Sequence, residues 1–453
     1  MSTDTKAEVA INESSWPSSL IAKNISYEVP SKESKSDIKL LDNVNVHFRC
    51  GRMTCLMGTS GAGKSTFLDV IAGYKTGGTI TGDVLIDGRV KDLATWKRIS
   101  GYAEQQDILN PYLSVLETLR FTANCRLPKS SNKEEVVRRV IQLMDIEEWG
   151  DSIIGREKDG EGLPKHVRKR VTIANGKIAG CVFFPFVIWS VMYSSFCDGL
   201  ELVSLPKILF LDEPTTGLGT NEAALVINAV RQATDSMSLI TVATIHQPSK
   251  RIFSTFDDVL FLTKGGKMTY MGESATVLDH FGSLANSSAP EECNPSDFCL
   301  GVIDQLTPDD ARAGFERSGL NKDLLESIER EIENGMASAA PSILSKRPNS
   351  TLAEVFLLTK RHTIVQWRNP SYCFMRMASS IVMSLFLSIL FYCDKSTLEG
   401  AVFSIGAIFF LVFVLVIPMQ AAVVPLVEDR AVSSFILAGD CNIFSIFLSA
   451  HQS

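Results

Sequence analysis

The chain has 453 residues and a formal charge of −7, from 44 Lys and Arg against 51 Asp and Glu. Hydrophobic residues make up 45% and charged residues 21%, with a mean hydropathy of +0.13. This composition excludes a disordered or fibrous chain and favours a membrane protein. The acidic balance excludes general nucleic-acid binding, which needs an excess of Lys and Arg. The 10 Cys form no CxxC pair, so we predict neither a zinc site nor a disulfide framework and expect a reducing cytosol.

The N-terminal part of the sequence predicts a cytosolic α/β domain. Residues 1–20 are polar and lack the features of a secretory signal, so we expect a disordered start in the cytosol. From residue 21 to 282, helical stretches alternate with apolar runs, which predicts a largely parallel sheet. The runs expected to form strands are Thr54–Met57, Val84–Ile86, Ile208–Leu211, Leu239–Thr244 and Val259–Leu262.

The C-terminal part predicts a membrane region. Residues 283–350 are rich in Ser, Asn, Pro and charge and read as a linker with an acidic helix near Lys322–Asn334. Residues 351–370 predict an amphipathic helix at a membrane surface, broken at Asn369-Pro370. In 371–453, spans at about 375–394 and 401–427 are long enough for a hydrocarbon core of roughly 30 Å. Basic residues before the first span keep the N-terminal domain cytosolic. A pair of buried core helices is the alternative.

A glycine-rich run at 58–65, GTSGAGKS, fits GxxxxGK[ST] between a predicted strand and the predicted helix 66–72. Glycines let backbone N–H groups point at phosphates, Lys64 neutralises β- and γ-phosphate oxygens, and the Ser65 hydroxyl can bind Mg²⁺. A purely structural turn is the alternative, against which the Lys-Ser pair argues. The residues predicted to bind the nucleotide here are Gly58, Thr59, Ser60, Gly61, Ala62, Gly63, Lys64, Ser65 and Thr66.

Polar residues follow two of the predicted strands. The run at 208–211 ends in Asp212, placed for the magnesium shell, and Glu213, placed for the attacking water. Such an ending is weak evidence by itself and gains value beside the glycine-rich loop. His246 follows the run at 239–244 and could reach a γ-phosphate, although a lone His is more often structural. Gln105, in GYAEQQD, is unremarkable by itself.

Together these motifs resemble the nucleotide-binding domain of an ABC transporter, most closely its G-type, pleiotropic-drug-resistance branch, over about 21–430. The matching segments are the loop at 58–65, GYAEQQDI with Gln105 as the Q-loop, VRKRVTIA at 167–174, ILFLDEPTTGL at 208–218, TIHQPS at 244–249 with His246 as the switch histidine, and FDDVLFLTKGGKMTYMGE at 256–273. The resemblance implies an α/β P-loop nucleotide-binding domain, with a mixed sheet and a helical subdomain, followed by α-helical transmembrane segments.

The same resemblance implies an ATP-driven exporter subunit with ATP and Mg²⁺ as cofactors. Catalytic roles fall on Glu213, His246 and Gln105, and metal ligation on Ser65, Asp212 and Gln105. Tyr27, in NISYEVP, is positioned like the aromatic that stacks on adenine, with an ordinary strand tyrosine as the alternative. Two such domains meet head to tail, so the implied partners are the lipid bilayer and a second ABC half, in a homo- or heterodimer. Each ATP lies between one P-loop and the partner's signature loop.

The signature loop departs from the family pattern. Where the family carries LSGGQ, this chain reads LPKHV at 163–167, so the serine and both glycines are replaced. Pro164 also removes one N–H donor. Gly219 stands where the family usually has Asp. We therefore expect an intact ATP-binding half and a poor surface for a partner site.

Two further departures concern the integrity of the chain. Residues 175–199 form an atypical apolar insertion inside the cytosolic domain, too short to span a bilayer comfortably. We interpret it as an artefact of the gene model, such as a retained intron, with a buried insertion as the alternative. The family continues through further membrane helices beyond the position of Ser453. We interpret the chain as a truncated or misannotated half-transporter.

Three functions remain open from the sequence. The leading hypothesis is a subunit that couples ATP hydrolysis to export of amphipathic or lipid-like substrates. The second is a catalytically weak, non-transporting nucleotide-binding subunit that acts only with a partner. The third, a soluble P-loop kinase, is disfavoured by the two spans and by the segments around His246 and Gln105.

Overall fold

A computed structural model describes residues 17–30, 37–75, 77–91, 96, 99–105, 109–127, 131–156, 161–175, 206–287, 290, 293–337 and 351–390. These residues fall into two compact units. The larger one holds the described parts of 17–109, 114–175 and 206–337, and the smaller one holds 351–390 with the short segment 110–113.

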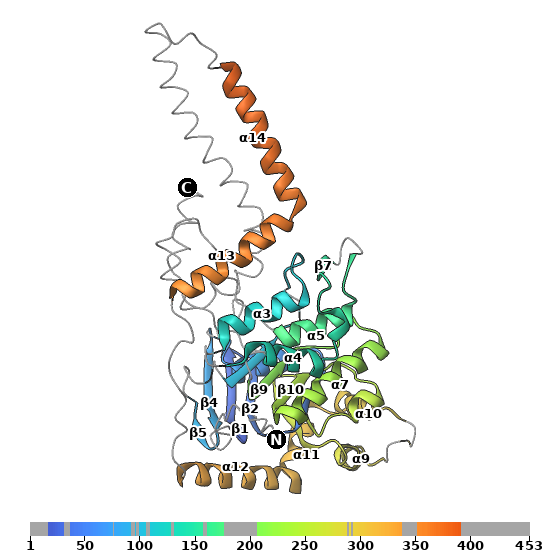
Figure 1. The fold of residues 1–453 in the computed structure, drawn as a ribbon. Helices are drawn as coiled ribbons and strands as arrows, with labels where there is room; N and C mark the ends of the chain where they lie inside the picture. The colour runs from blue at the N-terminus through green and yellow to red at the C-terminus, as the bar shows by residue number, and fades with distance from the viewer. Residues whose placement is uncertain are drawn as a thin grey trace, which may run out of the picture. The chain divides into compact units, whose positions relative to one another are not determined.

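The larger unit contains a ten-stranded sheet in the order β5-β4-β1-β2-β12-β11-β3-β10-β9-β6 (Figure 1). Its strands are β1 (Ser19–Val29), β2 (Ile38–Arg49), β3 (Met53–Gly58), β4 (Thr79–Ile86), β5 (Arg89–Val90), β6 (Ser100–Ala103), β9 (Ile208–Leu211), β10 (Ile240–Thr244), β11 (Asp258–Thr263) and β12 (Lys267–Glu273). Strands β11, β3, β10, β9 and β6 pair in parallel with one another in that order, and β12 pairs in parallel with β2. Strands β11 and β12 pair antiparallel, as do β1 with β2, β1 with β4, and β4 with β5. A short hairpin, β7 (Gly155–Arg156) with β8 (Glu161–Gly162), stands apart. The predicted mixed sheet and all five predicted strands are confirmed.

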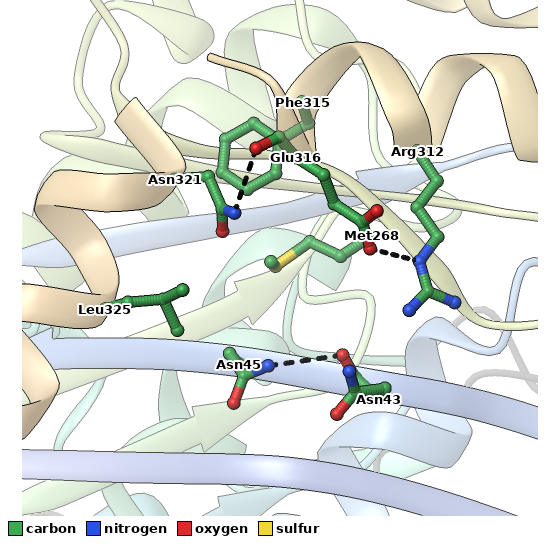
Figure 2. A pocket seen from close by; sticks show the side chains of 8 residues that line it. All are labelled: Asn43, Asn45, Met268, Arg312, Phe315, Glu316, Asn321 and Leu325. Atoms are coloured by element: carbon green, nitrogen blue, oxygen red, sulfur yellow. Dashed lines mark hydrogen bonds and ion pairs between the residues drawn. The ribbon is translucent and has the colours of Figure 1, made fainter. Parts of the chain in front are cut away.

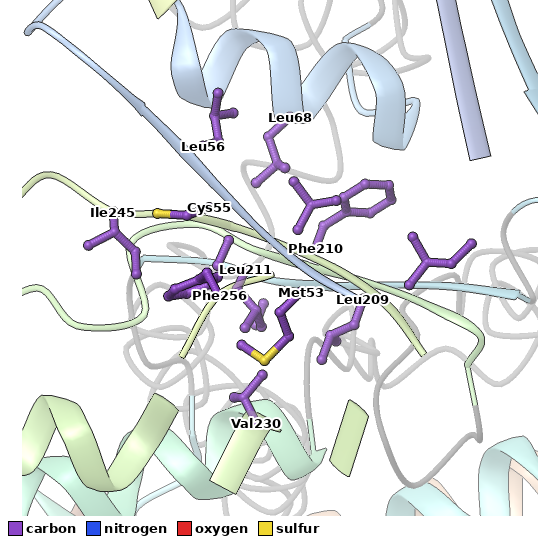
Figure 3. Packing of buried hydrophobic residues seen from close by; sticks show 14 of the residues in the cluster. Met53, Cys55, Leu56, Leu68, Leu209, Phe210, Leu211, Val230, Ile245 and Phe256 are labelled. Carbon is purple, nitrogen blue, oxygen red and sulfur yellow. The ribbon is translucent and has the colours of Figure 1, made fainter. Parts of the chain in front are cut away.

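The central strands are apolar because helices cover both faces of the sheet. Every residue of β3, β9, β10 and β11 is buried. In Figure 3, Leu68 approaches the sheet from the helix after the glycine-rich loop, and Val230 approaches from the opposite side. The core therefore fixes where these parallel strands end, and the loops after them form the site.

The described residues of the larger unit also form helices. They are α1 (Lys64–Ala72), α3 (Val115–Arg126), α4 (Lys133–Leu143), α5 (Lys165–Asn175), α7 (Thr220–Met237), α8 (Lys250–Phe253), α9 (Val277–Ala285), α10 (Pro295–Gln305), α11 (Pro308–Glu316) and α12 (Gly319–Ala337), with a 3₁₀ turn at Glu147–Trp149. Helix α3 contacts both α4 and α5, and α4 and α5 each contact α7. Arg170 of α5, only 4% exposed, donates to the Met144 and Asp145 carbonyls just after α4. This group is the predicted helical subdomain.

The region 283–350 differs from the predicted linker. Helices α10, α11 and α12 belong to the larger unit, because Cys299, Ile303 and Phe315 are buried in its core. Helix α12 includes the predicted acidic helix. It lies against the sheet, where Ile328 is 1% exposed in a cluster with residues of β1 and β4. Residues 338–350 lie outside the described residues.

The smaller unit contains two helices, α13 (Thr351–Arg368) and α14 (Pro370–Leu390), described by themselves. Asn369 separates them, just before Pro370. The amphipathic role of this segment at a membrane surface stays a prediction. Large apolar side chains are exposed along both helices: Phe356, Trp367, Phe374, Met377, Ile381, Val382, Leu385 and Phe386. Across the described part of the chain, none of the helices has the length and apolar character that crossing a membrane requires.

Several predictions lie wholly or partly outside the described residues. The expected span at 375–394 is described only as far as Leu390, and the span at 401–427 is not described. The insertion at 175–199 is described only at Asn175. That residue is the last of α5, is 3% exposed and accepts a hydrogen bond from Thr122 at 2.6 Å. Asn175 therefore belongs to the helical subdomain and not to the insertion.

Candidate active site

The glycine-rich loop joins β3 to α1 in a shape that needs glycine. Gly58 has φ +151°, and a Cβ there would lie 2.1 Å from the Leu262 carbonyl oxygen of β11. Gly63, the residue before α1, has φ +89° and makes no side-chain cap. The first N–H groups of α1 therefore open toward the loop, an arrangement suited to an anion.

Lys64 is the buried cation of this loop. It is 7% exposed, and its Nζ donates to the carbonyls of Gly58 at 2.9 Å and Thr59 at 3.1 Å. Burial lowers the pKa of the Lys64 ammonium, while the carboxylates of Glu213 and Asp212 act to raise it. A phosphate oxygen entering the loop would compete with these carbonyls for the ammonium.

Asp212 lies beside the loop because β3 and β9 flank β10 and end at the same edge of the sheet. Its Oδ1 accepts hydrogen bonds from Ser65 Oγ at 3.0 Å and from Thr244 Oγ1 at 2.8 Å. Burial raises the pKa of Asp212, and the bonds from Thr244 and Ser65 act to lower it. A hydroxyl and a carboxylate thus meet next to the expected phosphate position.

Glu213 contacts the other two predicted catalytic residues, Gln105 and His246. Its Oε2 accepts from Gln105 Nε2 at 2.6 Å, and its Oε1 lies 2.7 Å from His246 Nε2. Thr216 Oγ1 also donates to Oε2, at 2.9 Å. The backbone of Glu213 has φ +48°. The carboxylate is therefore held from three loops of the chain.

The sequence did not reveal three residues that hold this arrangement. Thr216 and Thr244 lie inside the quoted segments, yet a hydroxyl in a loop or at a strand end has no distinctive pattern. Lys169 of α5 is 4% exposed and donates from Nζ to the carbonyls of Gln105 at 2.7 Å and Glu104 at 3.2 Å. A lysine on the apolar face of α5 is the one signal available for it, because an exposed lysine would face solvent.

Tyr27 does not occupy the predicted role. Its ring is 5% exposed in β1, and its hydroxyl donates to the Gly77 carbonyl at 2.9 Å. A base can stack only on an open ring face, so the adenine-stacking prediction is wrong. The alternative, an ordinary strand tyrosine, fits the observed contacts.

The signature-loop residues lie on a different part of the unit. Leu163 and Val167 are buried, and α5 begins at Lys165. His166 Nδ1 lies 3.3 Å from Glu222 Oε1 of α7, and Glu222 Oε2 accepts from the Gly219 N–H at 3.1 Å. These bonds to Gly219 and His166 lower the pKa of Glu222. The two departures from the family pattern, His166 and Gly219, are therefore tied to one carboxylate.

The residues present fit a nucleotide with Mg²⁺. Within the described residues, the buried Thr59 hydroxyl has no hydrogen-bond partner, and a phosphate oxygen would satisfy it. Mg²⁺ in phosphate sites is usually held by one or two carboxylates plus the substrate phosphates. Ser65 and Asp212 supply such oxygens. Gln105, predicted as a ligand as well, has its amide on Glu213.

The fold and this site define the class of P-loop nucleotide-binding domains. Residues 41–179 match the ABC transporter family, and residues 246–359 and 353–437 match two families of ABC-2 type transporters. The first match ends before Asp212, so the placement of Asp212 and Glu213 rests on the geometry above. The dimeric structure of MJ0796, a bacterial ABC transporter cassette, aligns at 20% identity with a TM-score of 0.42, covering 56% of this chain and 98% of that one.

Curated relatives narrow the assignment. ABC transporter G family member 21 of Dictyostelium discoideum is 33% identical over 404 residues, covering 86% of this chain and 26% of that protein. ABC transporter G family member 32 of Arabidopsis thaliana is 33% identical over 445 residues, covering 92% and 29%. Parts of the chain are thus similar to ABC transporters, and these two relatives are G family members. The chain spans about a quarter of the length of these relatives. The pleiotropic-drug-resistance branch stays a prediction.

Proposed function

We propose that the chain is the ATP-binding and hydrolysing subunit of a membrane exporter that moves amphipathic or lipid-like molecules. The observation that carries the proposal is the Glu213 carboxylate, held by Gln105 and His246. Through the neighbouring Asp212 and Ser65 it adjoins a loop built for phosphates. Such an arrangement suits phosphoryl transfer to water, in which positioning and electrostatics do most of the work.

In the proposed mechanism, different residues of the chain serve different steps of ATP hydrolysis. Lys64 and the N–H groups of the loop bind the phosphates, and Ser65 with Asp212 would hold Mg²⁺. Bound Mg²⁺ would neutralise charge on the β- and γ-phosphates. Glu213 would accept a proton from the attacking water. His246 and Gln105 fix the orientation of that carboxylate.

The proposed assembly needs a second ABC half. Residues 163–167 lack the serine and glycines of LSGGQ, so an intact loop would come from the partner. We place the nucleotide-binding unit in the cytosol and the region matching ABC-2 type transporters in the bilayer as a multi-pass domain. Closure and opening of the ATP sandwich would move the membrane helices.

A second function is a weak, non-transporting subunit that acts only with a partner. The contact of His166 with Glu222 supports it, because that contact ties the signature segment to its own α7. In both functions the chain binds ATP, and they differ in whether transport follows.

ATP turnover in a membrane preparation tests the proposal. The full chain is expressed with a full-length G-family half and compared with the same preparation carrying Glu213→Gln. Exporter function predicts ATP turnover together with vesicle uptake of a fluorescent phospholipid, both lost in the variant. Turnover without any uptake supports the second function. Absence of ATP binding by the unmodified chain contradicts both.

A further inference from the structure

We propose that Thr244 is a positioning residue: its hydroxyl ties Asp212 to the backbone of Glu213 and holds both carboxylates for ATP hydrolysis. This inference rests on the proposed ATPase function. Thr244 is the last residue of β10 and is 0% exposed. Strands β10 and β9 pair in parallel with Ala243 opposite Leu211, so Thr244 faces the point where β9 ends.

The hydroxyl of Thr244 both accepts and donates a hydrogen bond. It accepts a hydrogen bond from the Glu213 N–H at 2.8 Å and lies 2.8 Å from Asp212 Oδ1. A hydroxyl has one proton to donate. That proton goes to Asp212, since the other acceptor, the Leu211 carbonyl, is farther away at 3.5 Å. One buried oxygen atom therefore links two consecutive acidic residues.

The bond to the Glu213 N–H holds an unusual backbone. Glu213 has φ +48°, a left-handed conformation that residues with a side chain rarely adopt. Such conformations persist where the surroundings fix them, and they are frequent at functional sites. The turn at Glu213 aims its carboxylate at Gln105 and His246 instead of continuing the line of β9.

The bond to Asp212 fixes the second carboxylate. Its Oδ1 accepts from two hydroxyls, Thr244 on β10 and Ser65 on α1. Two donors from different elements restrict rotation of the carboxylate more than either does alone. Valine at 244 keeps the shape of threonine and removes both hydrogen bonds, leaving the Glu213 N–H without its partner.

Strand β10 supplies a matched control. Thr241 is also 0% exposed, and its hydroxyl pairs with Thr234 of α7 at 2.8 Å. Thr241→Val therefore removes a buried hydroxyl from the same strand without touching either carboxylate. Thr244→Ser keeps the hydroxyl and removes only a methyl group.

The first test compares ATP hydrolysis by the full chain, paired as above, in these three variants. Loss of a residue that orients catalytic ligands typically costs about 10- to 100-fold in activity. We expect Thr244→Val to lower kcat by that amount while KM for ATP changes far less. Thr244→Ser should restore most of the turnover, and Thr241→Val should behave as the unmodified chain does. Equal losses in both valine variants would overturn the proposal.

The second test does not require ATP turnover. Amide hydrogen exchange of the full chain is followed by mass spectrometry in peptides containing Glu213. Faster exchange there in Thr244→Val, with unchanged exchange in Thr244→Ser and Thr241→Val, supports the tie to the backbone. Unchanged exchange in Thr244→Val contradicts it. An unmodified chain that never hydrolyses ATP refutes the proposed function, and this exchange result still decides whether Thr244 holds Glu213.

Discussion

Two parts of the chain differ in how well they suit a nucleotide: the segments that would hold its own ATP, and the signature segment at 163–167 that it would offer to a partner. In the first group, residues from the start of α1, from the loop after β6 and from the end of β10 converge on the two carboxylates that follow β9. In the second, residues 163–167 read LPKHV, and His166 is bound to Glu222 of α7. In the proposed assembly, each ATP lies between the P-loop of one ABC half and the signature loop of the other. One chain can therefore keep its binding half and still be a poor donor to its partner.

The physical difference lies in backbone access. Glycines in a signature loop let N–H groups approach a facing phosphate closely. Pro164 has no N–H, and the side chains of Lys165 and His166 occupy the space of the two glycines. The P-loop keeps that access, because Gly58 stands where no Cβ fits.

The largest effect on ATP turnover is expected from a substitution at Glu213, which lies among the segments that would hold the chain's own ATP. General-base groups contribute about 10²- to 10⁴-fold in rate, so Glu213→Gln should slow hydrolysis within that range. ATP binding should persist, because the amide keeps an oxygen acceptor and the phosphate loop is unchanged. Turnover and ATP affinity are measured on the full chain beside Glu326→Gln, an exposed position on α12. Unchanged turnover in Glu213→Gln would remove Glu213 from the mechanism.

Repair of the signature segment at 163–167 should give the next largest effect. Removing one transition-state donor costs on the order of 10²- to 10³-fold in rate. We expect the joint change Pro164→Ser, Lys165→Gly and His166→Gly to raise turnover of the chain alone by up to that factor. ATP affinity of the separate chain should stay unchanged, since the phosphate loop is elsewhere. A repaired chain no faster than the original would contradict a defect at this loop.

Lys64→Ala should act on binding rather than on the chemical step. A hydrogen bond to a charged group is worth about 1.5–3 kcal/mol, which predicts an ATP affinity weaker by about 10- to 100-fold. Titration with a fluorescent ATP analogue measures the loss. Lys322→Ala, whose side chain is 79% exposed on α12, is the matched control. An unaltered affinity in Lys64→Ala would contradict the assignment of the phosphate loop.

The smallest effect is expected from removing residues 176–199, next to the signature helix α5. Loop-closure entropy changes slowly with length, so shortening the connection between α5 and β9 should alter stability by only about 1 kcal/mol. Retaining Asn175 preserves its buried bond to Thr122. Thermal unfolding of both chains with and without ATP gives the comparison. Loss of folding in the shortened chain would show that 176–199 is a structural element.

Much of the fold and of the ATP-binding half could be predicted because the signal is local. Apolar runs mark β3, β9 and β10, and the glycine pattern marks the loop after β3. The role predicted for Tyr27 was wrong because the sequence does not show whether an aromatic ring in a strand is buried or open to a ligand. The role of Thr244 depends on the register of β10 with β9 and on the left-handed turn at Glu213, neither of which is local.

The predicted linker failed for a related reason. Helices α10 and α11 bury only some of their residues, including Cys299 and Phe315, within a segment rich in polar residues. Composition therefore suggested an open chain. Helix α10 packs against α8 and α9, and α11 packs against β12, so the two helices become recognisable only once those elements are in place.

A pocket beside these helices illustrates the same point. Asn43 and Asn45 of β2, Met268 of β12 and Phe315 of α11 converge there, as Figure 2 shows. Arg312 also lines the pocket and donates hydrogen bonds to Asp42 and Glu316. The pair with Asp42 joins α11 to β2, whereas the pair with Glu316 lies within α11.

The most direct test of the asymmetry is ATP turnover by the chain alone and with a nucleotide-binding domain that carries an intact LSGGQ-type loop and the equivalent of Glu213→Gln. In that mixture only the site formed by this chain's P-loop and the partner's signature can hydrolyse ATP. We predict little turnover by the chain alone and a rise of about 10²-fold in the mixture. Equal turnover in both preparations would contradict the account.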